Sequence, residues 1–265
     1  MYSSAQLALK YINYWVHASN GKGHGVHSPF VFELITKVFN NRATDTSFKQ
    51  IEAIRTALLS SGDVLQVEDF GAGSATGLRK QRTVQQIAAT SLKKPKYARL
   101  LYRLVEYFRP ATVLELGTSL GTTTLYLAKA QGNRAVITME GSVAIAEVAR
   151  RNFDQLGLQN VQLIRGNFDE TLVSVIQTQP QLDFVYIDGN HRKEPTLRYF
   201  DQLLSVSTTQ SVFVFDDIHW SGEMEEAWET IKAHPSVTLT IDLFFIGLVF
   251  FRPQQLQKEH FVIRF

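Results

Sequence analysis

The sequence lacks cysteine, has little net charge and contains no long apolar run. The absence of cysteine excludes disulfide bonds, thiolate metal sites and cysteine nucleophiles, and it makes a reduced, cytoplasmic setting the expected one. The 27 Lys and Arg residues nearly balance the 25 Asp and Glu residues, so the net charge of +2 lacks the basic footprint of a nucleic-acid-binding protein. No uncharged apolar run reaches the roughly 18 residues that a bilayer-spanning helix needs, and the N-terminus lacks the pattern of a secretory signal. We therefore expect neither a nucleic-acid partner nor a membrane partner.

The length of 265 residues predicts one large domain or a domain with an added lobe, since a domain typically spans about 150 residues. In residues 1–91 the apolar positions recur at helical spacing, which predicts a mostly helical N-terminal lobe or cap. Residues 92–265 are predicted to form the second domain. It opens with a helix that starts at Pro95 and ends before Pro110.

From residue 111 onward, short apolar runs alternate with amphipathic helical segments. The runs cover residues 112–116, 135–139, 161–164, 184–187 and 212–215, and the helical segments cover residues 121–131, 142–156, 168–178, 194–205 and 222–233. Such alternation predicts an α/β fold, with a parallel sheet covered by helices on both faces. The last two apolar runs, 237–243 and 247–251, are separated by so short a turn that they must pair antiparallel.

The residues directly after the first predicted strand are expected to bind a ligand, because open parallel sheets bind ligands at the carboxyl ends of their strands. Gly117 allows a tight turn there, and the following helix offers its free N–H groups to a carboxylate. The dinucleotide pattern G-x-G-x-x-G is absent, which argues against a pyrophosphate cradle. Glu140 ends the second strand, where an acid is placed to accept hydrogen bonds from ribose hydroxyls.

Five motifs in register resemble those of the class I S-adenosylmethionine-dependent methyltransferases, particularly the small-molecule O-methyltransferases of the catechol and caffeoyl-CoA type. They are VLELGTSLGTTT from Val113, ITMEGS from Ile137, RGNFDE from Arg165, FVYIDGNH from Phe184 and FVFDDIHW from Phe213. The similarity covers residues 92–252. It implies a Rossmann-like fold whose seven-stranded sheet has the order 3-2-1-4-5-7-6, with strand 7 antiparallel. It also implies transfer of a methyl group from S-adenosylmethionine (SAM) to a small-molecule acceptor, foremost to a hydroxyl group.

The resemblance further implies a cofactor site, position by position. Glu115 and Gly117 would flank the methionine part of SAM, and Thr123 would meet its carboxylate. Glu140 would hold the ribose, and Asn167-Phe168 would lie along the adenine. The predicted cofactor site is completed by Thr118, Ser119, Gly141 and Asp188.

Three acids follow adjacent predicted strands, Asp188 after the fourth and Asp216 and Asp217 after the fifth. In the metal-dependent members of the resembling family, the equivalent positions hold Mg²⁺ with two Asp and one Asn, whereas this chain has Asp217 where the Asn is expected. An extra carboxylate still suits a hard divalent cation. The alternative is that Asp188 and Asp216 only cap loops and orient the cofactor or the acceptor. Both interpretations stay open at this point.

His191 stands where the resembling enzymes carry a lysine beside the acceptor hydroxyl. Histidine titrates near neutrality and can accept a phenol proton, so His191 is the predicted general base and Asp188 its catalytic companion. A structural or substrate-orienting role for His191 is the alternative. His219, beside the acids of the fifth strand, is a second candidate for a catalytic part.

Two other interpretations fit part of the sequence. Gly117 to Gly121 also match the G-x-S-x-G elbow of α/β-hydrolases with Ser119 as nucleophile, and Asp188 and His219 follow in the order of such a triad. Against it, the chain has mostly helix before this loop, and Glu140 is left unexplained. The other alternative is a non-enzymatic cofactor-binding or scaffold protein that kept the fold and lost the transfer activity.

The sequence leaves three questions open. The methyl acceptor cannot be read from it. Exposed aromatic residues in the lobe would suit a homodimer, but core packing explains them equally well. The segment from Val67 to Gly73 mimics a first methyltransferase motif without the strand that should follow, so it is either a loop near the active-site mouth or a plain surface turn.

Overall fold

The computed structural model describes residues 1–41, 46–68, 81–132, 134–254 and 257–265. The chain divides into two compact units. We call them the terminal unit, Met1–Asn41 with Gln179–Phe265, and the central unit, Arg42–Thr178. This division differs from the predicted boundary between residues 91 and 92, which stays a prediction. Most of the segment from Val67 to Gly73 lies outside the described residues.

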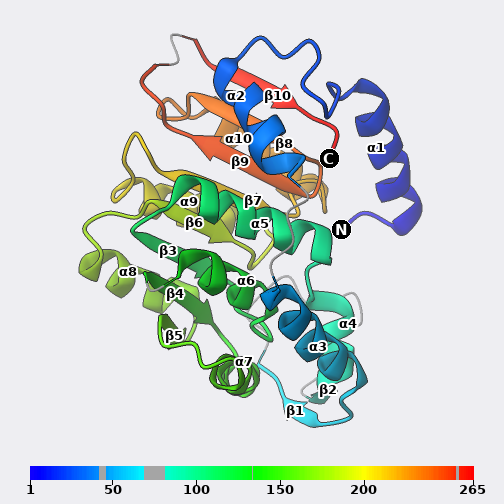
Figure 1. Cartoon of the computed structure of the whole chain (residues 1–265), viewed down its shortest axis with the longest axis vertical. Coiled ribbons are helices and arrows are strands. Elements are labelled where there is room, and N and C mark those ends of the chain that lie inside the picture. Colours follow the sequence, from blue (N-terminus) through cyan, green and yellow to red (C-terminus); the bar gives the residue numbers. More distant parts are fainter. Residues whose placement is uncertain (42–45, 69–80, 133, 255–256) are drawn as a thin grey trace. The chain divides into compact units, whose positions relative to one another are not determined.

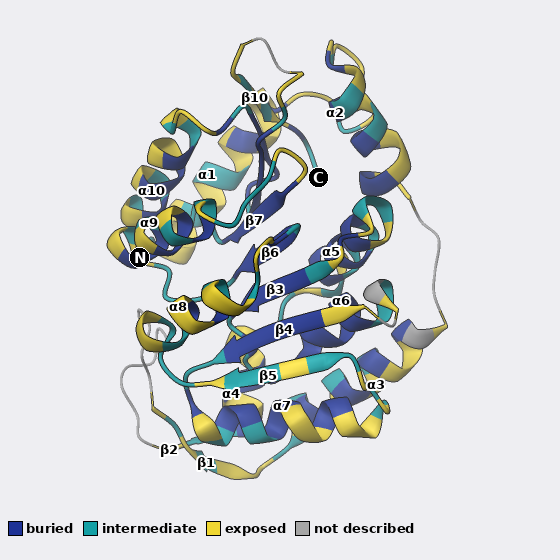
Figure 2. Ribbon diagram, turned by 90° about the vertical axis from the view of Figure 1, so that its left-hand side faces the viewer, coloured by how far each residue is buried: buried dark blue, intermediate teal, exposed yellow. Residues whose placement is uncertain are grey.

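The central unit holds three parallel strands in the order β3-β4-β5 (Figure 1). They are β3 (Thr112–Leu116), β4 (Ala135–Glu140) and β5 (Val161–Arg165). β3 is buried almost throughout, whereas β5 alternates between partly buried and exposed residues, as expected of an edge strand (Figure 2). The other elements of this unit are α3 (Ser47–Ser60), β1 (Val64–Gln66), β2 (Gln81–Thr83), α4 (Val84–Ser91), α5 (Pro95–Phe108), α6 (Thr122–Gln131), α7 (Val143–Gln155) and α8 (Phe168–Thr178).

Gly121 is needed where the chain enters α6. Its φ of 82° lies in the left-handed region, and a Cβ at this position would come within 2.6 Å of the Phe153 ring. Phe153 on α7 belongs to the core cluster of this unit, together with Leu120 and Leu125. A residue without a side chain therefore lets α6 pack close to α7, and this packing fixes the loop between β3 and α6.

The terminal unit holds the remaining five strands, in the order β10-β8-β9-β7-β6. β6 and β7 are parallel, β9 runs antiparallel to both β7 and β8, and β10 runs parallel to β8. β6 and β7 are buried over their whole length (Figure 2). The elements of this unit are α1 (Ser4–His17), α2 (Pro29–Leu34), the π-helix η1 (Ile35–Phe39), β6 (Phe184–Ile187), α9 (Lys193–Leu204), β7 (Val212–Asp216), α10 (Gly222–Ala233), β8 (Leu239–Asp242), β9 (Ile246–Phe250) and β10 (Glu259–Val262).

The predicted α/β architecture is confirmed, but the predicted seven strands are not. The terminal unit has one strand more than predicted, because β10 adds to the edge beside β8, and the predicted order lacks this strand. The sequence of β10, EHFV, alternates exposed and partly buried residues and carries only two apolar side chains. Such a short pattern gives little strand signal. The antiparallel pairing of β1 with β2 was not predicted either. Among the described residues, no helix is long and apolar enough to cross a membrane.

Candidate active site

The carboxylate of Glu115 is buried at the end of β3 and is held by hydroxyl groups. Its Oε2 accepts hydrogen bonds from Thr138 Oγ1 at 2.6 Å and from Thr124 Oγ1. Thr138 lies on β4 and Thr124 in the first turn of α6, so one carboxylate joins three elements. Burying a charged group is unfavourable unless such donors replace its water. Glu115 therefore ties down the start of the loop that precedes α6.

The loop between β3 and α6 is shaped by backbone conformations that few residues adopt. Gly117 has a φ of 105° and Ser119 one of 47°. The N–H groups of Gly117 and Thr118 both donate to the carbonyl of Met139, each at 3.0 Å. No side chain caps the N-terminus of α6. The N–H groups of its first turn, which includes Thr123, thus suit an anionic ligand such as a carboxylate.

Glu140 joins this loop to the end of β4. Its Oε2 accepts a hydrogen bond from the Ser119 N–H at 2.8 Å, and its Oε1 accepts one from the Ser142 N–H at 2.9 Å, across Gly141. Glu140 therefore holds the start of the loop after β4 to the loop that precedes α6. The Ser142 side chain is buried, and its hydroxyl has no hydrogen-bond partner among the described residues. A buried hydroxyl in this state suits a site that receives a polar ligand.

Asn167 and Phe168 follow β5 at the same edge. Gly166, with a φ of 131°, donates its N–H to the carbonyl of Glu140 at 3.0 Å and so connects the ends of β5 and β4. Asn167 Oδ1 accepts from the Asp169 N–H at 3.1 Å, and α8 begins at Phe168. The structure thus gathers the predicted cofactor residues of the central unit at the carboxyl ends of β3, β4 and β5. We call this set the cofactor edge.

Two of the predicted acids end neighbouring strands of the terminal unit. Ile187 of β6 pairs with Phe215 of β7, so Asp188 and Asp216 come next at the same edge. Asp217 has a φ of 53°, and its N–H donates to the carbonyl of Phe245 at 2.7 Å.

The predicted Mg²⁺ site finds no support in this arrangement. Within the described part of the chain, no group of three or more His, Asp or Glu residues is placed to hold a metal ion.

Asp188 and His191 form a close pair. His191 Nε2 lies 3.4 Å from Asp188 Oδ1, and the two side chains are 25% and 17% exposed. Tyr186, buried in β6, donates its hydroxyl hydrogen to Asp188 Oδ2 at 2.8 Å. The imidazole is therefore partly open to solvent and faces an acid that is itself anchored, which is the arrangement of a base and its orienting group.

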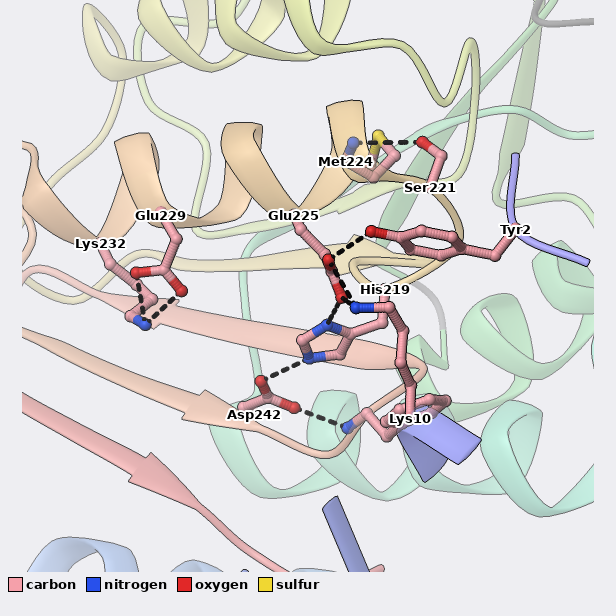
Figure 3. A network of polar contacts seen from close by, with 10 residues as sticks. Tyr2, Lys10, His219, Ser221, Met224, Glu225, Glu229, Lys232 and Asp242 are labelled. Atoms are coloured by element: carbon pink, nitrogen blue, oxygen red, sulfur yellow. Dashed lines mark hydrogen bonds and ion pairs between the residues drawn. The ribbon is translucent and has the colours of Figure 1, made fainter. Parts of the chain in front are cut away.

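His219 lies in a different environment, between two carboxylates (Figure 3). Its Nδ1 is 3.0 Å from Glu225 Oε1 and its Nε2 is 2.8 Å from Asp242 Oδ2. Glu225 also accepts hydrogen bonds from Tyr2 and Lys10, which brings α1 into the network. Burial opposes the charged imidazole, but the hydrogen bonds and charges of Asp242 and Glu225 outweigh it and raise the pKa of His219.

These contacts do not fit the hydrolase interpretation. Both ring nitrogens of His219 are engaged with carboxylates, so neither can accept the proton of a nucleophilic serine. Ser119 Oγ donates to Ser91 Oγ at 2.8 Å. His219 has a structural role in binding α1 through Glu225.

The stability of the fold should reflect the raised pKa of His219. Because the folded pKa lies above the unfolded value, the stabilisation is fully present below the unfolded pKa and is lost as the pH rises through the folded pKa. We expect wild type to lose more unfolding free energy than His219→Gln between pH 6 and 9, measured by urea denaturation. His260→Gln is the control, because burial and Lys232 lower the pKa of His260 and its pH dependence has the opposite sign. Parallel pH curves for wild type and His219→Gln would contradict the expectation.

The sequence was compared with models of known protein families. Residues 114–218 match a family model described as a methyltransferase domain. This part of the chain is therefore similar in sequence to methyltransferases. The predicted site residues from Glu115 to Asp217 lie within the matched residues, and His219 lies just beyond them.

Relatives and solved structures agree with this assignment. The chain is 28% identical to a catechol O-methyltransferase from Niastella koreensis over 165 residues, which cover 61% of this chain and 72% of the relative. It resembles an O-methyltransferase from Bacillus cereus in complex with SAH, with a TM-score of 0.55, 21% identity and coverage of 80% and 93% of the two chains. An SAH-bound methyltransferase from Podospora anserina gives a TM-score of 0.58 at 11% identity, covering 95% and 97%. The structural likenesses show the fold, and the sequence match confirms the predicted resemblance to class I SAM-dependent O-methyltransferases.

Sequence reasoning missed several residues that hold the site in place. Thr138 and Thr124 hold Glu115, Tyr186 holds Asp188, and Asn190 shapes the turn before His191. A signal for Tyr186 existed, because it precedes Asp188 by two positions, and alternate residues of a strand share a face. The partners of Asn190 are Tyr199 on α9 and Arg192 just before α9, and they left no comparable pattern.

Proposed function

We propose that this protein transfers a methyl group from SAM to a hydroxyl group of a small molecule. The cofactor edge is the observation that carries the proposal. It combines the Gly117 loop, the uncapped start of α6, Glu140 and Asn167-Phe168 at the ends of three parallel strands. A ligand such as SAM has a carboxylate, a ribose and a base. The cofactor edge offers N–H donors for the carboxylate and an acidic acceptor for the ribose hydroxyls.

The residues of the central unit are assigned to the cofactor. The N–H groups of the first turn of α6, with Thr123, bind the methionine carboxylate, and the loop of Gly117, Thr118 and Ser119 lies against the methionine part. Glu140 and Gly141 bind the ribose, and Asn167-Phe168 lie along the adenine. Bound SAM supplies an electrophilic methyl group on a sulfonium.

Residues of the terminal unit are assigned to the acceptor. With Asp188 next to Nε2, a neutral His191 ring carries its hydrogen on Nε2 and its basic lone pair on Nδ1. Nδ1 accepts the proton of the acceptor hydroxyl as the new oxygen–carbon bond forms and the sulfur–carbon bond breaks. Asp188 stabilises the resulting imidazolium, and the hydroxyl of Tyr186 keeps Asp188 in place.

Mg²⁺ bound by Asp188, Asp216 and Asp217 stays a prediction, as do a homodimer, a cytoplasmic location and the absence of a nucleic-acid partner. The methyl-transfer assay with an acceptor panel is run once in EDTA and once in Mg²⁺. A metal requirement then shows directly as a difference in the rate of methyl transfer.

The test is an acceptor panel analysed by mass spectrometry. The purified protein is incubated with SAM and with phenols and catechols, and in parallel with amines and thiols. We expect a methylated oxygen and an equal amount of S-adenosylhomocysteine (SAH). Transfer only to nitrogen or sulfur would contradict O-methylation. A protein that binds SAH and methylates no acceptor would favour the non-enzymatic alternative.

A further inference from the structure

The turn that carries His191 has an unusual backbone. Asn190 has a φ of 67° and His191 one of 33°, so two consecutive residues with side chains lie in the left-handed region. Glycine adopts this conformation without strain, whereas other residues occupy it at a cost, and such strain is found mainly where the surrounding structure enforces it. Asparagine tolerates the left-handed region better than most residues, but glycine would be the least strained choice at position 190.

The side chain of Asn190 is anchored at both of its polar atoms. Its Nδ2 donates to the hydroxyl oxygen of Tyr199 at 3.1 Å, and its Oδ1 accepts from Arg192 Nε at 2.8 Å. Tyr199 is fully buried in α9, and Arg192 is the residue just before that helix. The amide therefore links the strained turn to a fixed helix.

This link determines where the imidazole lies. The backbone at residues 190 and 191 sets the direction in which the His191 side chain leaves the turn, and that direction brings Nε2 to 3.4 Å from Asp188. Asp188 is fixed from the other side by Tyr186. The pair thus has one anchor on each member, Tyr186 for the acid and Asn190 for the base.

We propose that Asn190 is a positioning residue, which holds His191 against Asp188 through its amide contacts with Tyr199 and Arg192. The proposal rests on the proposed function, in which His191 accepts the proton of the acceptor. A glycine at position 190 separates this role from a purely structural one. It accepts the backbone conformation without strain, which offsets part of the cost of the lost hydrogen bonds to Tyr199 and Arg192, so the protein stays folded while the imidazole loses its placement.

The experiment compares wild type with Asn190→Gly by three readouts. We expect the variant to stay folded, with a melting temperature close to that of wild type, and to keep its KM for SAM. Its kcat with catechol should fall about 10- to 100-fold, because a misplaced catalytic group loses the benefit of orientation. The ring signals of His191 in a ¹H–¹⁵N correlation spectrum, assigned by their absence in His191→Gln, should shift or broaden.

The matched control is Arg109→Gly. Arg109 is the C-cap of α5 and has a φ of 49°. A glycine there relieves the same kind of backbone strain as Asn190→Gly, but outside the site. This variant should gain stability and keep both kcat and the His191 ring signals.

Failure of the inference and failure of the proposed function are distinguishable. An Asn190→Gly variant with wild-type His191 ring signals would overturn the positioning role, whatever acceptor the enzyme uses. A kcat equal to that of wild type would overturn it as well. A wild-type protein that methylates no hydroxyl compound would instead overturn the proposed function, and the ring signals would still decide whether Asn190 places the imidazole.

Discussion

The His191→Ala variant is expected to methylate catechol about 100-fold or more slowly than wild type, the range that removal of a general base produces. Its Kd for SAH should be unchanged, because the proposed cofactor residues belong to the cofactor edge and not to the turn of His191. The imidazole lies 3.4 Å from Asp188 and is partly open, so its removal takes away the proton acceptor without opening the core. The measurement is kcat by SAH release and Kd by calorimetry.

The matched control is His24→Ala, which removes an exposed histidine from the terminal unit. It should keep the wild-type kcat. If His191→Ala and His24→Ala were equally active, His191 would have no part in proton transfer. The alternative of a structural or substrate-orienting role would then hold.

A second large effect is expected from Glu140→Ala, which should bind SAH about 30- to 100-fold more weakly than wild type. The variant leaves the N–H groups of Ser119 and Ser142 without their acceptor, and an unmet hydrogen bond of this kind costs about 1–3 kcal/mol. It also removes the predicted acceptor for the ribose hydroxyls. The affinity of Glu140→Gln for SAH should lie between those of wild type and Glu140→Ala, because glutamine keeps the shape of the side chain and one acceptor oxygen.

Glu147→Ala serves as the control for charge. Glu147 is an acid of α7 in the same unit, where it pairs with Arg150 and Arg165 at the surface. Its removal should leave the affinity for SAH unchanged. A Glu140→Ala protein that binds SAH as tightly as wild type would show that Glu140 does not belong to the cofactor site.

Much of the fold could be predicted because its strands and helices carry strong periodic signals. The strand at Thr112–Leu116 and the helix at Pro95–Phe108 have the predicted bounds, since β3 is a short and mostly apolar run and Pro95 marks a helix start. β10 was missed because an edge strand with one half-exposed face needs few apolar residues. It pairs with β8 and not with β9, its neighbour in the sequence, and no local pattern predicts that pairing.

The candidate site also contains residues that could be predicted from the sequence and residues that could not. Glu140 could be predicted, because an acid that ends a strand of a parallel sheet lies at the ligand-binding edge. The three-acid metal site was predicted because Asp188, Asp216 and Asp217 follow adjacent strands and match the metal positions of the resembling family. Among the described residues, no group of acids or histidines is placed to hold a metal ion. The anchoring of Asn190 depends on Tyr199, nine positions further along the chain, and only the folded structure brings the two together.

The central claim is that the ends of β3, β4 and β5 form a site for SAM, and a calorimetric titration of the wild-type protein with SAH tests it most directly. The account predicts one site per chain with a Kd in the micromolar range, and a weaker affinity in Glu140→Ala. The absence of binding by a folded wild-type protein, even at millimolar SAH, would contradict the account.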